Sequence, residues 1–174
     1  MTRKQVGTAI GMAVGLVLTI AAFVWPGGPG ARIDRVALWA ACAASAVGWL
    51  ALAVALQARH RFFSPADIDG AGLTAASARA QLLQALIQNT AEQTVLAALA
   101  YAAWLLATPT SSPGPAVHCA VLFSLGRLLF FAGYAHGAAA RSLGFALTFY
   151  PTVGLLVLSL PGAVATLIGV LSGG

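Results

Sequence analysis

The sequence predicts an all-α integral membrane protein. Hydrophobic residues make up 60% of the 174 positions, charged residues make up only 7%, and the mean hydropathy is +0.89. A water-soluble domain with so few charges could not cover its own surface. The chain also lacks the ten-residue segments of in/out alternation that build membrane β-barrels. Membrane-spanning helices are therefore the expected elements.

Five apolar stretches are long enough, or nearly so, to cross the roughly 30 Å of hydrocarbon in a bilayer, which takes about 20 helical residues. Residues that favour turns, mainly Pro, Gly, Ser and Asp, separate them. The predicted spans are residues 7–25, 36–57, 78–107, 116–140 and 144–171.

The first span follows two basic residues, Arg3 and Lys4, and could be a signal peptide. The residues before Pro26 offer no small-x-small cleavage site. We therefore expect the span to be retained.

Basic residues indicate the orientation. If the spans alternate, one side collects Arg3, Lys4, Arg59, Arg61, Arg79 and Arg141, and the other side collects only Arg32 and Arg35. The positive-inside rule then places the N-terminus and the 58–77 loop in the cytoplasm. We expect a multi-pass protein of a bacterial cytoplasmic membrane. The net charge of +5 is a topology signal rather than a nucleic-acid-binding surface, so no nucleic-acid partner is expected.

The third span carries a polar stripe. Gln81, Gln84, Gln88 and Glu92 follow one another at three- and four-residue steps, so they share one helix face. Asn89 lies at the edge of this stripe. Polar side chains at this depth are costly in lipid, so the stripe is expected to face protein.

In the fourth span, Arg127, Tyr134 and Arg141 recur every seven residues and are expected to share a face. Arg127 and Glu92 each lie about 20 Å from the cytoplasmic end at 1.5 Å per residue. We therefore predict that Glu92 and Arg127 form an ion pair. The pair could be purely architectural, because buried polar groups often only hold membrane helices together.

Tyr134 and Arg141 are better functional candidates, because they lie nearer the cytoplasmic mouth. The alternative is an interfacial aromatic and a topology-setting cation. No metal site is expected, because Cys42, Cys119 and His118 have no partners at ligand spacing.

The polar residues of the third and fourth spans resemble a known family. The run from Gln88 to Gln93, followed by Arg127, then Gly133-Tyr134, then Arg141, resembles the MAPEG family, the membrane-associated proteins in eicosanoid and glutathione metabolism. The resemblance covers about residues 36–171. It implies a MAPEG-like four-helix bundle over residues 36–174, with one additional N-terminal transmembrane helix and its loop over residues 1–35.

The resemblance also implies a homotrimer that binds glutathione, as a co-substrate, between protomers near the cytoplasmic side. Arg141 matches the arginine that activates the thiol. The residues expected to contact glutathione are Arg59, Asn89, Glu92, Arg127 and Tyr134. A cation beside a thiol lowers the thiol pKa, which suits this chemistry.

The chain departs from the family pattern at three positions. Ala85 stands where glutathione-using members carry an arginine for the tripeptide carboxylate, Phe130 where many carry a tyrosine, and Gln93 where tyrosine is common. Losing that arginine removes a contact of about 1.5–3 kcal/mol, so glutathione affinity is expected to fall roughly ten- to hundredfold.

Two hypotheses follow from these residues. The first is a trimeric glutathione-dependent transferase or peroxidase that acts on lipophilic electrophiles. The second is a non-catalytic membrane scaffold or lipid-binding homologue. Under both, the expected partners are other copies of the chain, membrane lipids and a lipophilic small molecule. A transporter is less favoured, because the spans show no inverted repeat.

Overall fold

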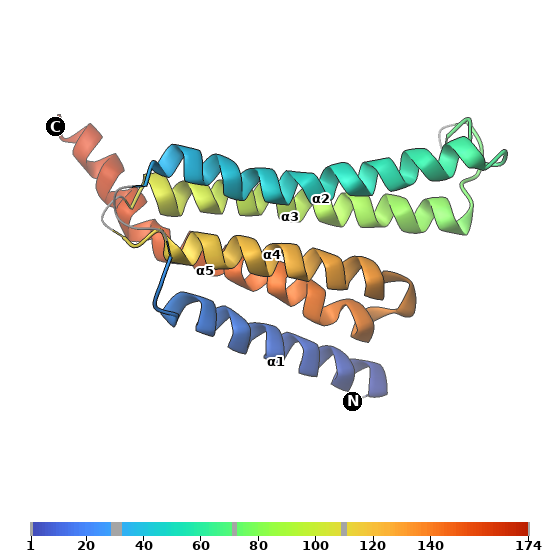
Figure 1. The fold of residues 1–174 in the computed structure, drawn as a ribbon, viewed down its shortest axis with the longest axis horizontal. Helices are drawn as coiled ribbons and strands as arrows, with labels where there is room; N and C mark the ends of the chain where they lie inside the picture. The colour runs from blue at the N-terminus through green and yellow to red at the C-terminus, as the bar shows by residue number, and fades with distance from the viewer. Residues whose placement is uncertain (1, 29–32, 71–72, 109–110, 174) are drawn as a thin grey trace.

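The computed structural model describes residues 2–28, 33–70, 73–108 and 111–173, and these residues form a bundle of long helices (Figure 1). The described residues contain no strand, so the predicted all-α fold class is confirmed. In chain order the helices are α1 (Arg3–Val24), α2 (Arg35–Phe63), α3 (Ala78–Leu106), α4 (Gly114–Gly133), the 3-10 turn η1 (Tyr134–His136) and α5 (Ala138–Leu171).

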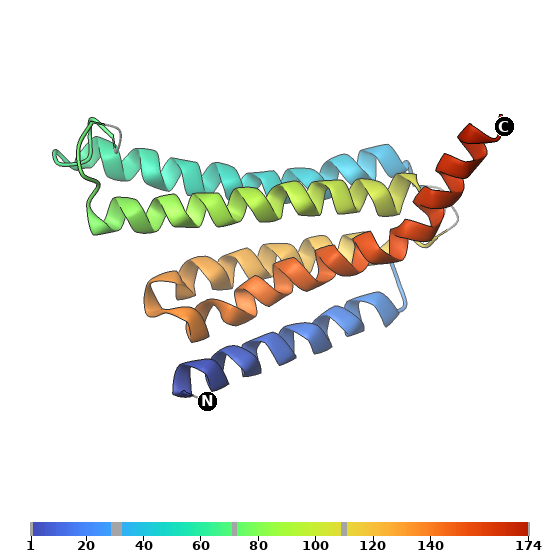
Figure 2. The same cartoon turned by 180° about the vertical axis from the view of Figure 1, so that it is seen from behind.

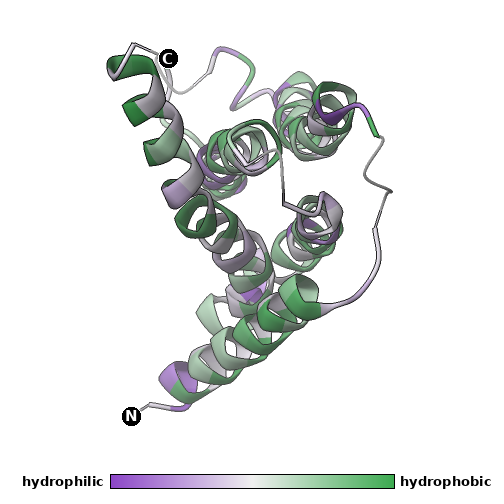
Figure 3. Ribbon diagram, turned by 90° about the vertical axis from the view of Figure 1, so that its left-hand side faces the viewer, coloured by the Kyte–Doolittle hydropathy of each residue, from purple (hydrophilic) through white to green (hydrophobic). Residues whose placement is uncertain are grey.

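Four of these helices are long and apolar enough to cross a membrane: α1, α2, α4 together with η1, and α5. α3 is as long as α2, at 29 residues, but it carries the glutamine stripe and is not among the four. In Figure 3 most of the helical ribbon has the colour of hydrophobic residues, as expected of helices that lie in lipid. The protein is a multi-pass membrane protein.

The helices are arranged as two antiparallel hairpins and one additional helix. α2 pairs with α3, α4 pairs with α5, and α1 packs on α5 and α4 on the side away from α2 (Figures 1 and 2). The start of α1, the α2–α3 loop and the α4–α5 turn lie together at one end of the bundle, which we call the basic end. It carries the larger set of basic residues: Arg3, Lys4, Arg59, Arg61, Arg79 and Arg141.

Side-chain caps fix the starts of three helices. Thr2 and Gln5 form a capping box before α1, and the side chains of Asp34 and Ser77 accept backbone N–H groups at the starts of α2 and α3. These bonds satisfy donors that a helix cannot satisfy internally.

The hydrophobic core lies toward the end opposite the basic end and draws on α2, α3, α4 and α5. Tyr101, Phe123 and Leu155 are almost fully buried there. Cys42 and Cys119 are buried in the same cluster, as expected of small apolar side chains.

α5 extends past the rest of the bundle. It has 34 residues, about 51 Å at 1.5 Å per residue, and contains Pro151 and Pro161. Figure 2 shows its last turns projecting beyond the other helices. The part of α5 that packs in the bundle is therefore its first two thirds, which begins beside the candidate site.

Candidate functional site

Arg127 is the most buried charged residue described, with no exposed surface. Its Nη1 donates to Asn89 Oδ1 on α3 at 3.0 Å, and its Nη2 donates to Thr148 Oγ1 on α5 at 2.7 Å. The guanidinium also stacks on the ring of Phe130, 4.4 Å from its centroid. Arg127 thus joins three helices at one point. Hydrogen bonds rather than an ion pair hold its two terminal nitrogens, and its buried Nε has no hydrogen-bond partner among the described residues.

The predicted ion pair between Glu92 and Arg127 is wrong within the protomer. Glu92 is exposed and accepts a hydrogen bond from Gln88 Nε2 at 3.2 Å. The predicted match in position along the two helices holds to within one turn, because Arg127 reaches Asn89, three residues before Glu92. A three-residue step leaves the two side chains only about 60° apart around the helix axis, and the packing of α3 on α4 turns Asn89 toward Arg127 while Glu92 stays exposed.

Tyr134 and Arg141 meet across a turn. α4 ends at Gly133, and Gly137, at φ 95°, redirects the chain into α5. A positive φ of this size favours glycine. The Arg141 guanidinium lies over the Tyr134 ring, 4.6 Å from its centroid. The expected seven-residue face on one continuous helix is therefore wrong for Arg141, which belongs to the first turn of α5 and reaches Tyr134 through the turn.

A cavity of about 320 Å³ brings together three of the predicted site residues, Asn89, Tyr134 and Arg141. We call it the Tyr134–Arg141 pocket. It lies at the basic end, and the buried Arg127 is bonded to one of its lining residues, Asn89. Its other lining residues come from α1, α4 and α5: Thr8, Met12, Phe130, Ala138, Ser142 and Phe145.

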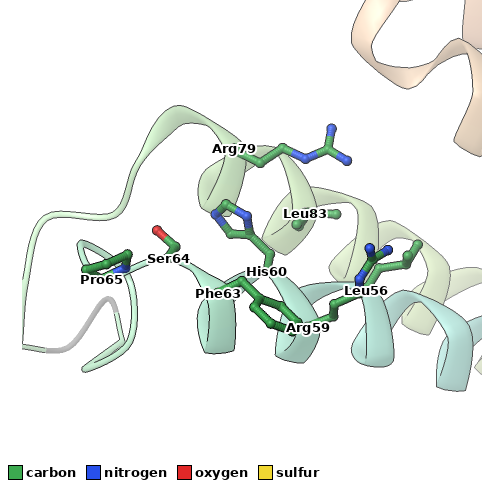
Figure 4. A pocket seen from close by; sticks show the side chains of 8 residues that line it. All are labelled: Leu56, Arg59, His60, Phe63, Ser64, Pro65, Arg79 and Leu83. Atoms are coloured by element: carbon green, nitrogen blue, oxygen red, sulfur yellow. The ribbon is translucent and has the colours of Figure 1, made fainter.

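Arg59 lines a different cavity. This cavity of about 560 Å³ lies between the end of α2 and the start of α3, and Figure 4 shows Arg59 and Arg79 at its rim with Leu83 between them. Within one protomer the structure does not bring Arg59 or Glu92 to the Tyr134–Arg141 pocket.

Asp67 organises the loop beside the Arg59 cavity. Its carboxylate accepts hydrogen bonds from the Ser77 N–H at 2.8 Å, from the hydroxyls of Ser77 and Ser64 at 2.7 and 2.9 Å, and contacts His60 Nε2 at 2.9 Å. These bonds, led by those from Ser77, hold the pKa of Asp67 well below its usual range. Ser77 Oγ also accepts from the Ala80 N–H and caps α3, so the cluster fixes the loop rather than presenting a nucleophile.

The polar stripe of α3 lies on the surface of the protomer. Gln81, Gln84, Gln88 and Glu92 are all exposed, although the helix lies among membrane spans. Beside the stripe, Gln57 on α2 is buried, donates to Gln84 Oε1 at 3.4 Å and leaves its own Oε1 without a partner among the described residues. This surface is unsuited to contact with lipid.

Sequence reasoning missed the contributions of Thr148, Thr8 and Met12. Thr148 is a polar residue in an apolar span, a signal that could have suggested a partner for Arg127. Thr8 and Met12 carry no such signal. Only the packing of α1 on α5 places them at the pocket.

The comparisons with known proteins give one match. A model of the MAPEG family matches residues 36–161, which is well over half of the chain and includes every predicted site residue. α1 lies outside the matched residues. No curated protein and no solved structure matches the chain.

Proposed function

Since this chain belongs to the MAPEG family, we propose that it is a trimeric membrane enzyme that uses glutathione to conjugate lipophilic electrophiles or to reduce lipophilic peroxides. The observation that carries the proposal is the Tyr134–Arg141 pocket. The pocket brings together the cation of Arg141, the phenol of Tyr134 and the amide of Asn89, and it is large enough for a small ligand.

Arg141 is the proposed catalytic residue. It is partly exposed, and no Asp or Glu among the described residues forms a salt bridge with it. A guanidinium with no counter-ion can stabilise a glutathione thiolate and so lower the thiol pKa. The thiol proton leaves to water, and the thiolate becomes the nucleophile.

The reaction then takes one of two courses. In conjugation, the thiolate sulfur forms a bond to an electrophilic carbon, and the leaving group departs with the bonding electron pair. In peroxide reduction, two glutathione molecules supply two electrons, the O–O bond breaks, and the products are glutathione disulfide, an alcohol and water. Both courses need the thiolate beside Arg141.

Asn89 and Tyr134 are proposed to bind glutathione directly, whereas Arg127 is a positioning residue. The Arg127 guanidinium donates a hydrogen bond to the Asn89 side-chain oxygen at 3.0 Å. The Asn89 NH₂ group is then left to donate into the pocket. Arg127 itself does not line the pocket. Its effect on ligand binding should therefore act through the orientation of Asn89.

The exposed polar stripe of α3 supports the proposed homotrimer. Gln84, Gln88 and Glu92 need protein cover at this depth, and a second copy of the chain can supply it. In such an assembly Glu92 and Arg59 would reach glutathione from a neighbouring protomer. Their distance from the Tyr134–Arg141 pocket within one chain is consistent with that arrangement.

The clustering of basic residues supports the proposed orientation. Six basic residues gather at the end that holds both the N-terminus and the Tyr134–Arg141 pocket. We infer that this end faces the cytoplasm of a bacterial cell, where reduced glutathione would enter the pocket.

The test is glutathione binding by calorimetry on detergent-purified protein, with Arg141→Ala and the matched control Arg79→Ala. Arg79 is an exposed arginine at the same end but in the other cavity. We expect binding in the micromolar to low millimolar range that is weakened about ten- to hundredfold by Arg141→Ala and unchanged by Arg79→Ala. No binding at tens of millimolar would overturn glutathione use.

One observation favours the second candidate, a non-catalytic lipid-binding or scaffold protein. Ala85 leaves α3 without a cation at the position of the family's carboxylate-binding arginine, and the cavity that Ala85 lines has its one arginine, Arg61, on α2, with the carboxylate of Asp67 in the same lining. Phe130 stacks on Arg127 and offers no hydroxyl to a ligand. If the purified protein binds a lipophilic probe but neither binds nor turns over glutathione, the lipid-binding or scaffold function is the correct one.

A further inference from the structure

α1 is held on α5 by a stripe of glycines. Gly7, Gly11 and Gly15 recur every four residues and face Ala139, Ser142 and Ala146 in turn. A Cβ added at Gly7 would lie 3.0 Å from the Ala139 Cβ, and at Gly11 it would lie 2.9 Å from the Leu143 N and overlap Ser142. Such small-residue stripes let membrane helices approach closely. α1 is therefore docked with its axis close to α5.

The other end of α1 is fixed as well. His118 on α4 contacts the Ala22 carbonyl oxygen through Nδ1 at 2.9 Å. The Phe23 ring packs edge-on against Trp104, with centroids 6.4 Å apart, and lies over Gly154 of α5. Because α1 is held at both ends, the cavities beside it have a defined wall.

One face of α1 lines two cavities along its seam with α5. At the basic end, Thr8 and Met12 line the Tyr134–Arg141 pocket. Further along, Leu16, Thr19 and Phe23 line a second cavity of about 410 Å³, opposite residues of α5 that include Tyr150, Val153 and Val157. At about 100° per residue, these five α1 residues fall within roughly 80° of one another, and Ile20 and Val24, which also line the second cavity, lie farther round the helix. The two cavities share no lining residue, but they follow one another along the same seam; the first contains Arg141, and the lining of the second is almost wholly apolar.

We propose that α1 forms the wall of an acyl-chain groove, in which a long-chain carboxylate lies with its anionic end at Arg141 and its chain along Met12, Leu16 and Phe23. The proposal rests on the Tyr134–Arg141 pocket of the proposed function, but it requires no glutathione. It assigns a ligand-binding role to a helix outside the residues that the family model matches.

Charge and length support this occupant. The lining of the second cavity is almost wholly apolar, whereas the first contains Arg141, which has no acidic partner among the residues described. From Met12 to Phe23 the helix rises about 16 Å, a length suited to an extended acyl chain rather than to a compact ligand. Arg141 can hold a carboxylate by two parallel hydrogen bonds.

The experiment measures displacement of a fluorescent fatty acid by palmitate, octanoate and hexadecanol, with no glutathione present, on full-length protein in a non-ionic detergent. We expect palmitate to bind more tightly than octanoate or hexadecanol. Met12→Trp and Leu16→Trp, which fill the groove at partly exposed positions, should each weaken palmitate binding about tenfold or more and octanoate binding much less.

The matched control is Ile10→Trp, because Ile10 is 59% exposed and lies on the opposite side of α1 from Met12. It should leave palmitate affinity unchanged. Arg141→Gln should remove the preference for palmitate over hexadecanol. Equal effects of the Met12 and Ile10 variants, or equal affinity for palmitate and hexadecanol in wild type, would overturn the groove.

Two further readouts separate this proposal from the proposed function. Intact-mass measurement of the purified protein should show α1 present, and a mass lacking the first 25 or so residues would overturn the groove. Glutathione binding, measured by calorimetry, is tested independently of the groove. Palmitate binding without glutathione binding would support the groove and refute the glutathione reaction. Glutathione binding without palmitate binding would refute the groove and support the glutathione reaction.

Discussion

The Arg127 guanidinium donates to Asn89 Oδ1 at 3.0 Å, so the buried cation of α4 fixes an amide of α3 that lines the Tyr134–Arg141 pocket. This bond connects the stability of the bundle to the shape of the site. Thr148 and the Phe130 ring also stabilise the buried charge, although its Nε has no hydrogen-bond partner among the described residues.

Asn89→Ala should destabilise the protein by about 1.5–3 kcal/mol, because a buried guanidinium loses an acceptor. In a double-mutant cycle, Asn89→Ala and Arg127→Met should be coupled by about 0.5 kcal/mol or more. Thermal unfolding of the four proteins in detergent measures this coupling.

Glu92→Gln provides the control for that cycle. Glu92 contacts Gln88 rather than Arg127. The losses of unfolding free energy caused by Glu92→Gln and by Arg127→Met should therefore be additive within about 0.5 kcal/mol. Strong coupling between Glu92 and Arg127, with none between Asn89 and Arg127, would contradict the bonding seen in the structure.

Arg141→Ala should reduce turnover far more than stability. Arg141 is partly exposed and stacks on Tyr134, so its removal leaves no buried group unpaired, whereas a thiolate would lose its stabilising charge. We expect a large fall in kcat for glutathione conjugation with a nearly unchanged melting temperature. Arg79→Ala is the matched control, and equal activity of wild type and Arg141→Ala would exclude Arg141 as the activating cation.

Asp67→Asn should destabilise the protein at neutral pH, with an effect that disappears in acid. The pKa of Asp67 is lowered in the folded state, so its carboxylate contributes stability above the unfolded pKa of about 3.9, and the contribution is lost as pH falls toward the folded value. The difference in melting temperature between wild type and Asp67→Asn should be constant from about pH 7 to 5 and shrink below about pH 4.

The neighbouring Asp69→Asn is the control for this measurement, because Asp69 is exposed and makes none of the bonds of Asp67. It should leave the melting temperature nearly unchanged at every pH. A constant difference for Asp67→Asn down to about pH 3 would show that its charge contributes nothing.

Reporter fusions should place the C-terminus outside the cytoplasm and the α2–α3 loop inside it. Leu73 is an exposed insertion point in that loop, at 83%. The reason is the concentration of six basic residues at the basic end. A cytoplasmically fluorescent fusion after the last residue would show the orientation to be reversed.

The purified protein should be a trimer whose contacts include α3. The native cysteines, Cys42 and Cys119, are buried, so a cysteine introduced at the exposed Gln84 is the accessible one. Gln84→Cys should form crosslinks between protomers, and mass measurement in detergent should give three chains. A monomer by mass would remove the intersubunit contributions of Glu92 and Arg59.

Much of the fold could be predicted from hydropathy alone. Four of the five predicted spans are helices apolar enough to cross a membrane, and they and the grouping of basic residues follow from physical rules that act along the sequence. The boundary between the last two spans lies at Gly137 rather than after Arg141. The position of a residue along the bundle was equally accessible, because helical rise is uniform. Asn89 and Arg127 were therefore placed on the correct helices, and Tyr134 lies in the turn directly after α4.

Rotation about each helix axis was harder to predict. Whether Asn89 or Glu92 faces Arg127 depends on how α3 packs against α4, and no rule within α3 decides it. The position of Arg141 depended on Gly137, whose positive φ ends the helical periodicity assumed for the fourth span. The Gly7, Gly11 and Gly15 spacing was present in the sequence and would have predicted a close helix partner, though not which one.

The glycine stripe of α1 also constrains the order in which the protein can assemble. α1 leaves the ribosome well before its partner helix. The residues that cover its glycines, Ala139, Ser142 and Ala146, are made more than a hundred residues later. At about 5–20 residues per second, the helix waits for several seconds or longer in the membrane with its glycine face uncovered. Chains interrupted before α5 would keep that face open to other helices, so completion of translation is itself a step in closing the bundle.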